Sequence, residues 1–131
     1  LVPAKGMLLR GAERGLSKLE GLELADRVIR GTPPGGPVFI QEHGLTFGID
    51  LTEGQKTGYY LDQRDNRQAA ARYARGRRVL DMFCYSGGFA LACGKAGHAK
   101  SVLAVDASAK ATALAKANAE LNGVTTIDVE T

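Results

Sequence analysis

The sequence predicts an α/β fold in which an open parallel sheet with covering helices follows a small β-rich segment. An apolar run at 79–83 is followed by a glycine pair at 87–88, by a segment at 89–96 that can form a helix, and by a second apolar run at 101–105. The order strand, loop, helix, strand is typical of parallel strands joined by a helical crossover. We place a β-rich domain at 1-62 and the sheet domain at 63-131.

The glycine pair and the acid after the second run together predict a nucleotide site. Glycine lacks a Cβ, so a ligand can reach backbone N–H groups at the start of the helix. Asp106 lies 18 residues after Gly88, close to the ~20 residues expected between a glycine turn and a carboxylate that binds a ribose. An ordinary loop followed by a helix-capping acid is the alternative interpretation.

The glycine spacing narrows the class of ligand. Residues 85–89 read Tyr-Ser-Gly-Gly-Phe and lack the Gly-x-Gly-x-x-Gly pattern that makes room for a pyrophosphate. The sequence also has no Gly-x-x-x-x-Gly-Lys-Ser/Thr pattern. A nucleoside without phosphates therefore fits better, and S-adenosylmethionine is the common ligand of that kind.

Short strands are expected in the first half of the chain. Residues 7–10 and 27–30 are strand candidates, 13–22 form a short helix or a turn, and the glycine and proline cluster at 31–37 breaks regular structure. The clearest signal is a hairpin, in which a strand at 38–40 and a turn at 42–44 precede an alternating apolar series formed by Leu45, Phe47, Ile49 and Leu51.

A polar, donor-rich stretch with two tyrosines occupies 52–67. Such a stretch can hold a carboxylate and stack on a base, and a surface hairpin with a tyrosine anchor is the alternative. Asp65 is expected to cap a helix at 66–75 that Gly76 ends. The residues expected to face inward from this helix are Ala69, Ala70 and Tyr73.

The last helix is expected to begin at its N-cap, Ser108, and to end at Asn122-Gly123. Lys116 and Glu120 are spaced to form an i,i+4 ion pair. A third strand is expected at 127–129. The apolar stripe of the helix would consist of Ala107, Ala111, Leu114, Ala117 and Leu121.

The composition fits about one domain in a reducing compartment. Cys84 and Cys93 match neither a disulfide framework nor a zinc spacing, and His43 and His98 are interpreted as turn residues. The cysteine usage therefore predicts a reduced, cytoplasmic chain, and no apolar run reaches the ~18 residues of a membrane span. The formal charge is +3, and its surplus lies on a solvated helix face or on a face for polyanions, formed by Arg64, Arg67, Arg72, Arg75, Arg77 and Arg78.

Several stretches together resemble a known family. Residues 54–67 (GQKTGYYLDQRDNR), 79–90 (VLDMFCYSGGFA) and 117–123 (ANAELNG), with Val105-Asp106, are similar to the large-subunit ribosomal RNA cytosine-C5 methyltransferases. These are class I enzymes that use S-adenosylmethionine. Residues 18–22 and 42–44 also resemble the linking domain of that family. The resemblance implies a partial Rossmann-like class I methyltransferase sheet, a β-rich linking domain before it, and ribosomal RNA as the substrate.

The resemblance also implies roles for individual residues. Asp106 would hold the ribose hydroxyls, and Ser108 would lie beside the adenine edge next to Ala107. Tyr60, Gln63 and Arg64 would cover the methionine end of the cofactor. The cofactor loop itself would consist of Asp81, Phe83, Ser86, Gly87, Gly88 and Phe89.

The family's enzymes extend further at both ends, so the chain is expected to be a fragment. A PUA-type domain would precede Leu1, and the base-binding loop and the nucleophilic cysteine would follow Thr131. No catalytic residue and no metal site are therefore expected here, and neither Cys84 nor Cys93 is assigned as the nucleophile. Open sheet edges predict self-association, a swapped partner or a second chain.

Two other functions are kept as alternatives. The first is an NAD-dependent oxidoreductase in which Asp106 selects NAD, although that fold would need a third glycine. The second is a non-catalytic RNA-binding module that uses the face between Arg64 and Arg78. Methylation of a different RNA or a different base atom also stays open.

Overall fold

The structure is a computed structural model that describes residues 4–10, 26–52 and 58–131. Contacts divide the chain into two compact units, 1–36 and 37–131, and each is described by itself. The helix or turn expected at 13–22, the stretch 18–22 and residues 53–57 of the polar loop lie outside the described residues. The domain boundary expected after residue 62 stays a prediction.

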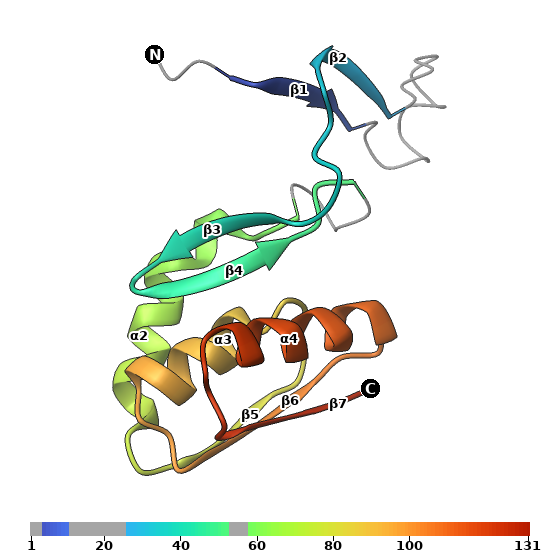
Figure 1. Ribbon diagram of the computed structural model, residues 1–131. Coiled ribbons are helices and arrows are strands. Elements are labelled where there is room, and N and C mark those ends of the chain that lie inside the picture. Colours follow the sequence, from blue (N-terminus) through green and yellow to red (C-terminus); the bar gives the residue numbers. More distant parts are fainter. Residues whose placement is uncertain (1–3, 11–25, 53–57) are drawn as a thin grey trace, which may run out of the picture. The chain divides into compact units, whose positions relative to one another are not determined.

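The first unit contains a two-stranded antiparallel sheet (Figure 1). Strand β1 spans Gly6–Leu9 and strand β2 spans Arg27–Gly31, and their register shifts between Met7 and Leu8. The two strands expected in this region are therefore confirmed.

The second unit begins with the expected hairpin. Strand β3 spans Val38–Glu42 and strand β4 spans Leu45–Ile49, and they pair in antiparallel register. The two-residue turn has positive φ at both positions, 49° at His43 and 78° at Gly44, as tight hairpin turns require. Leu45, Phe47 and Ile49 are buried, which confirms the predicted alternation. They pack with Tyr59, Ala71 and Leu91 in one of the two cores of the unit.

The rest of the second unit is a parallel sheet in the order β5-β6-β7. Its helices lie between this sheet and the hairpin, on one face of the sheet (Figure 1). Val102 and Ala104 of β6 are buried beneath them with Ala90, Cys93 and Ala115. The strands are β5 (Arg78–Asp81), β6 (Ser101–Val105) and β7 (Ile127–Glu130), and the crossover helices are α3 (Gly88–Leu91), continued by the π-helix η2 (Ala92–Ala96), and α4 (Ala109–Leu121).

The opposite face of the sheet carries exposed apolar side chains. Leu80 of β5 is 57% exposed and Met82, just after the strand, is 53% exposed. Within the described residues, β5 pairs with a strand on one side only.

The helix before the sheet differs from the prediction. A short 3-10 turn, η1 (Leu61–Gln63), leads into α2 (Arg64–Ala74), so Gln63 is the N-cap and Asp65 lies in the first turn without capping. Ala70 packs against the core as expected, but Tyr73 is 73% exposed and Ala69 is exposed as well. The prediction of their inward orientation was wrong because the inner face is set by the buried side chain of Arg67, with Ala71 and Ala74 on the same face.

The inner face of α4 is also rotated from the expected stripe. Ala111 is buried and Leu114 is partly buried, as expected, but Ala107 precedes the helix, and Ala117 and Leu121 are exposed. Thr112 and Asn118 are buried instead because both form hydrogen bonds inside the protein. Ser108 caps the helix as predicted, since its Oγ accepts from the Ala111 N–H at 3.3 Å. The described residues contain no ion pair between Lys116 and Glu120.

Candidate cofactor-binding site

Two carboxylates lie at the carboxyl ends of adjacent parallel strands. Asp81 ends β5, and its Oδ2 accepts a hydrogen bond from the Ala90 N–H at 3.2 Å. Asp106 follows β6, and its two oxygens accept from the N–H groups of Tyr85 (3.0 Å) and Ser108 (2.9 Å). Each carboxylate oxygen can accept two hydrogen bonds. Asp106 therefore holds the loop after β5 and keeps acceptor positions for hydroxyl groups.

The charge of this end of the sheet is negative. Burial raises the pKa of Asp81, the Ala90 and Phe83 N–H groups oppose that shift, and the nearby Asp106 adds to it. A carboxylate that is costly to ionise gains most from a cationic neighbour. The two acids can therefore attract a ligand that carries a positive group.

The glycine pair permits close packing inside the protein. Gly87 has a φ of +81°, and a Cβ there would lie 2.7 Å from Leu91 Cδ1 and 3.3 Å from Ala115 Cβ. A Cβ at Gly88 would lie 3.1 Å from Arg67 Cδ. Both glycines are buried, so their small size is needed for the approach of α4 and α2. Direct contact with a ligand stays a prediction.

The loop around the glycine pair exposes one large side chain and buries a small one. Phe83 is 87% exposed, Phe89 is half-buried, and Ser86 is buried. Tyr85 has a φ of +45°, and its hydroxyl donates to the Gly58 carbonyl at 3.3 Å. Its ring meets the ring of Tyr60 edge to face, with the centroids 5.6 Å apart. The structure thus brings Tyr60 next to the loop after β5, and the role of either in cofactor binding stays a prediction.

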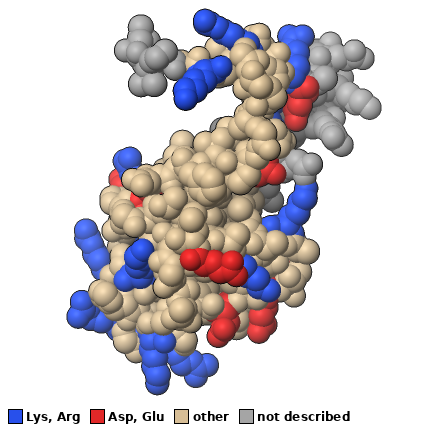
Figure 2. Space-filling view, viewed as in Figure 1, with Lys and Arg blue, Asp and Glu red and all other residues tan. Residues whose placement is uncertain are grey.

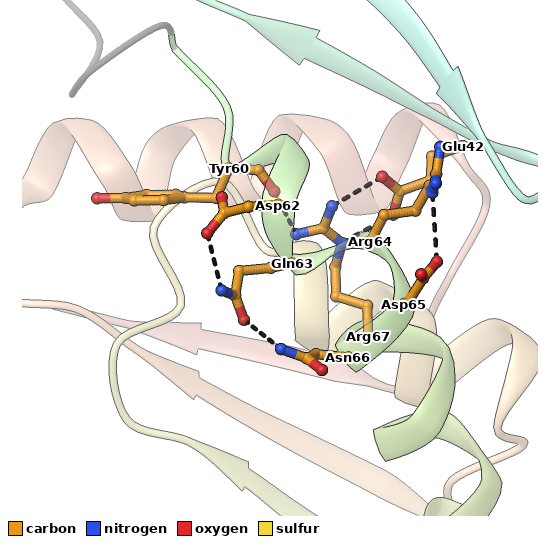
Figure 3. A network of polar contacts seen from close by, with 8 residues as sticks. All are labelled: Glu42, Tyr60, Asp62, Gln63, Arg64, Asp65, Asn66 and Arg67. Carbon is orange, nitrogen blue, oxygen red and sulfur yellow. Dashed lines mark hydrogen bonds and ion pairs between the residues drawn. The ribbon is translucent and has the colours of Figure 1, made fainter.

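Arg67 joins three parts of the second unit through buried contacts (Figure 3). Its Nε and Nη2 donate to the two carboxylate oxygens of Glu42, each at 2.7 Å, and its Nη1 donates to the Tyr60 carbonyl at 3.0 Å. The guanidinium also lies over the Tyr59 ring, 4.6 Å from its centroid. Sequence reasoning assigned Arg67 to a surface face, but its exposure is 2%. It ties the hairpin and the tyrosines to Gly88.

Gln63 and Arg64 bond to their helix neighbours. Gln63 donates to Asp62 Oδ2 at 3.0 Å and accepts from Asn66 Nδ2 at 2.9 Å. Arg64 is exposed and pairs with Asp65 at 3.4 Å. Figure 3 shows these side chains along η1 and the first turn of α2. Their role toward the methionine end of a cofactor stays a prediction.

Asn118 and Asn122, for which the sequence predicts no contact with the hairpin, fix α4 to it. Asn118 Oδ1 accepts from the Gly48 N–H at 2.7 Å, and its Nδ2 donates to the Ser86 carbonyl at 3.0 Å. One turn later, Asn122 exchanges two hydrogen bonds with the backbone of Thr46, at 2.8 and 2.7 Å. Asn118 therefore connects the hairpin to the glycine loop. The i,i+4 spacing of the two asparagines places them on the same face of the helix, and it is the only sign in the sequence that they act together.

The cysteines are unsuited to attack as thiolates. Burial, with smaller contributions from Asp81 and Asp106, raises the pKa of Cys84 to about 11. Burial raises the pKa of Cys93 as well. Both cysteines are free and buried.

The described residues contain no cluster that could hold a metal ion. None of the described helices is long and apolar enough to cross a membrane.

The parallel sheet, the glycine loop after its first strand and the acid after its second strand are typical of a Rossmann-like nucleotide-binding domain. A profile of the S-adenosylmethionine-dependent methyltransferase family matches residues 27–130. The chain belongs to that family, whose cofactor is S-adenosylmethionine.

The chain is also similar to curated proteins. It is 51% identical over 107 residues to the ribosomal RNA large subunit methyltransferase I of Erwinia tasmaniensis, a match that covers 82% of this chain and 27% of that protein. The protein of the same name from Aeromonas hydrophila is 51% identical over 114 residues, 86% of this chain and 28% of that protein. The chain thus spans about a quarter of the length of these relatives.

A solved structure supports the fold. The S-adenosylmethionine-dependent methyltransferase from Agrobacterium tumefaciens superposes with a TM-score of 0.74 at 24% identity, over 98% of this chain and 41% of that chain. The predicted α/β class with a Rossmann-like sheet is confirmed. The comparisons do not favour the NAD-dependent oxidoreductase alternative.

Proposed function

We propose that the protein methylates a base of large-subunit ribosomal RNA, with cytosine C5 as the target atom. The observation that carries the proposal is the 51% identity to two ribosomal RNA large subunit methyltransferases I over more than four fifths of this chain. The family match to S-adenosylmethionine-dependent methyltransferases supports the reaction class. The choice of cytosine C5 follows from the sequence resemblance alone.

The cofactor would lie across the carboxyl ends of β5 and β6. Asp106 would accept hydrogen bonds from the ribose hydroxyls at its remaining acceptor positions. Asp81 would face the cationic part of the methionine tail, where its burial makes a positive partner favourable. Ala107 and Ser108 would lie beside the adenine, and Tyr60 would cover the tail with Gln63 and Arg64.

S-adenosylmethionine supplies an electrophilic methyl group, and the residues of this chain would bind and orient it. Methylation at cytosine C5 requires a thiolate that adds to C6. Cys84 is buried and protonated at neutral pH because its pKa is about 11. We therefore assign cofactor binding, and not nucleophilic attack, to this chain.

Methyl transfer tests the proposal directly. The intact protein is incubated with large-subunit ribosomal RNA and S-adenosylmethionine that carries a tritiated methyl group, and the RNA is then digested and analysed by mass spectrometry. The expected product is 5-methylcytidine. Label in another base would contradict the C5 assignment and keep the reaction class. No label in the RNA would contradict the proposed function.

Binding of S-adenosylhomocysteine tests the cofactor site. Asp106→Asn removes the charge from the hydrogen bonds to the ribose, and such bonds contribute about 1.5–3 kcal/mol each. We therefore expect binding measured by calorimetry to weaken at least tenfold. The control is Asp128→Asn, an exposed acid on β7, for which no change is expected. Equal weakening by both variants would refute the placement of the ribose.

We also propose a cytoplasmic location and an association of β5 with further chain. The two free cysteines fit a reducing compartment. The open side of β5 and the exposed Leu80 fit an added strand or a second copy. A monodisperse monomer of the 131-residue chain in light scattering, with ordered amides throughout, would contradict the association.

A further inference from the structure

One stretch of the chain contains its whole excess of positive charge. Residues 66–105 include seven Lys and Arg residues and a single acid, Asp81, whereas the whole chain exceeds neutrality by only three charges. Arg67 belongs to the buried pair with Glu42, and Lys95 donates to the Asn122 carbonyl. Five exposed cations remain, and we call them the basic edge: Arg72, Arg75, Arg77, Arg78 and Lys100.

These cations come from the end of α2, the start of β5 and the two connections at this end of the sheet. The α2–β5 and η2–β6 connections pair along their backbones, because Arg75 and Ala99 form an antiparallel bridge and the Lys100 N–H donates to the Arg77 carbonyl at 2.8 Å. Arg78 is the first residue of β5 and pairs with Ser101 of β6. Figure 2 shows blue side chains gathered at the lower left, where Figure 1 places these connections. The basic edge is therefore one surface and not one helix face.

Among the described residues, the five cations of the basic edge have no ion-pair partner. Ion pairs between described residues involve Arg10, Arg64 and Arg67, and none of the five cations of the basic edge. Asp81, the acid of this stretch, lies at the other end of β5. Exposed like charges at close range repel one another. A surface that gathers them without acids is suited to a polyanion.

The basic edge lies at the amino-terminal ends of the parallel strands, opposite the candidate cofactor site. Arg78 begins β5 and Asp81 ends it, so about 10 Å of strand separates the two. We propose that the basic edge is a second RNA contact, which binds the phosphate backbone of a segment other than the target nucleotide. An arginine guanidinium forms two parallel hydrogen bonds to phosphate oxygens. Such contacts do not depend on the base sequence.

The choice of RNA among polyanions rests on the proposed function. Phosphate contacts release condensed counterions, so each contact adds about 0.7 to the slope of log affinity against log salt for single strands. At 0.15 M salt, one such contact corresponds to about a fourfold change in affinity. The basic edge should therefore contribute a measurable part of the salt dependence of RNA binding.

The test compares charge reversals of equal size in the intact protein. Arg77→Glu is expected to weaken binding of large-subunit ribosomal RNA at least fourfold at 0.15 M salt and to lower the salt slope by about 0.7. The double variant Arg77→Glu with Lys100→Glu should lower the salt slope about twice as much. The control, Lys116→Glu on α4, changes the charge equally and should leave both values unchanged. Affinity for S-adenosylhomocysteine should stay the same in all variants.

The outcomes separate this inference from the proposed function. If Arg77→Glu and Lys116→Glu weaken RNA binding equally, or if only binding to phosphatidylglycerol vesicles is lost, the basic edge is not an RNA contact. If the wild-type protein methylates no RNA but Arg77→Glu still weakens RNA binding, the proposed function fails and the RNA contact stands. Should Arg77→Glu unfold, the neutral pair Arg77→Gln and Lys100→Gln gives the same comparison.

Discussion

Removal of the Arg67 charge should destabilise the protein strongly. Arg67→Met leaves the Glu42 carboxylate buried without its two 2.7 Å hydrogen bonds, and both side chains are almost fully buried. Breaking one side of a buried pair costs about 3–5 kcal/mol. For a unit of this size, 1 kcal/mol corresponds to roughly 4–8 °C. The melting temperature should therefore fall by more than about 12 °C.

Urea unfolding followed by circular dichroism measures this effect, and a double variant sharpens it. Arg67→Met with Glu42→Leu removes both charges, so it should be more stable than Arg67→Met alone, because no uncompensated carboxylate remains. Two results would refute the reasoning. One is a loss below about 1 kcal/mol for Arg67→Met, as for an exposed pair, and the other is a double variant less stable than both single variants.

Three further predictions concern the candidate site. Gly87→Ala places a Cβ 2.7 Å from Leu91 Cδ1 at a φ of +81°, so it should lower the free energy of unfolding by at least about 1 kcal/mol. Urea unfolding measures this change. The control is Gly35→Ala, because a Cβ at Gly35 meets nothing within 4 Å. The pKa of Asp81 is raised in the folded protein, so its contribution to stability should be lost as pH rises from its ordinary pKa through the raised value. Asp81→Asn should abolish this loss, measured as the free energy of unfolding between about pH 3 and 6. The same pH dependence of stability in the variant and the wild type would contradict the prediction. Because the pKa of Cys84 is raised to about 11, the folded protein should react with iodoacetamide at pH 8 far more slowly than the urea-unfolded protein, and equal rates would contradict its burial.

The sequence was sufficient where a signal is local. The alternation from Leu45 to Ile49 and the turn at His43-Gly44 predict the hairpin because strand period and turn geometry depend on neighbouring residues. The order of apolar runs, glycines and acid predicts the parallel sheet because two strands joined by a helical crossover run parallel. The positions of Asp81 and Asp106 at one end of that sheet follow directly from its topology.

The sequence was insufficient where a polar side chain is buried by a distant partner. Arg67 lies 25 residues from Glu42, and Asn118 lies 70 residues from Gly48. Neither partner can be found from periodicity, so the sequence predicts an exposed Arg67 and an apolar stripe on α4 that wrongly includes Ala117 and Leu121. The alanine-rich helix α4 also has only a weak apolar stripe, so tertiary hydrogen bonds decide how it is rotated.

The amides of Asn118 and Asn122 have a consequence for how this chain can pair with others. Their side-chain oxygens accept hydrogen bonds from the N–H groups of Gly48 and Thr46, two residues apart on β4. A neighbouring strand would accept hydrogen bonds from these N–H groups in the same way. α4 thus substitutes for a third strand of the hairpin and protects that side from intruding peptides. Any strand exchange with another molecule is thereby directed away from β4.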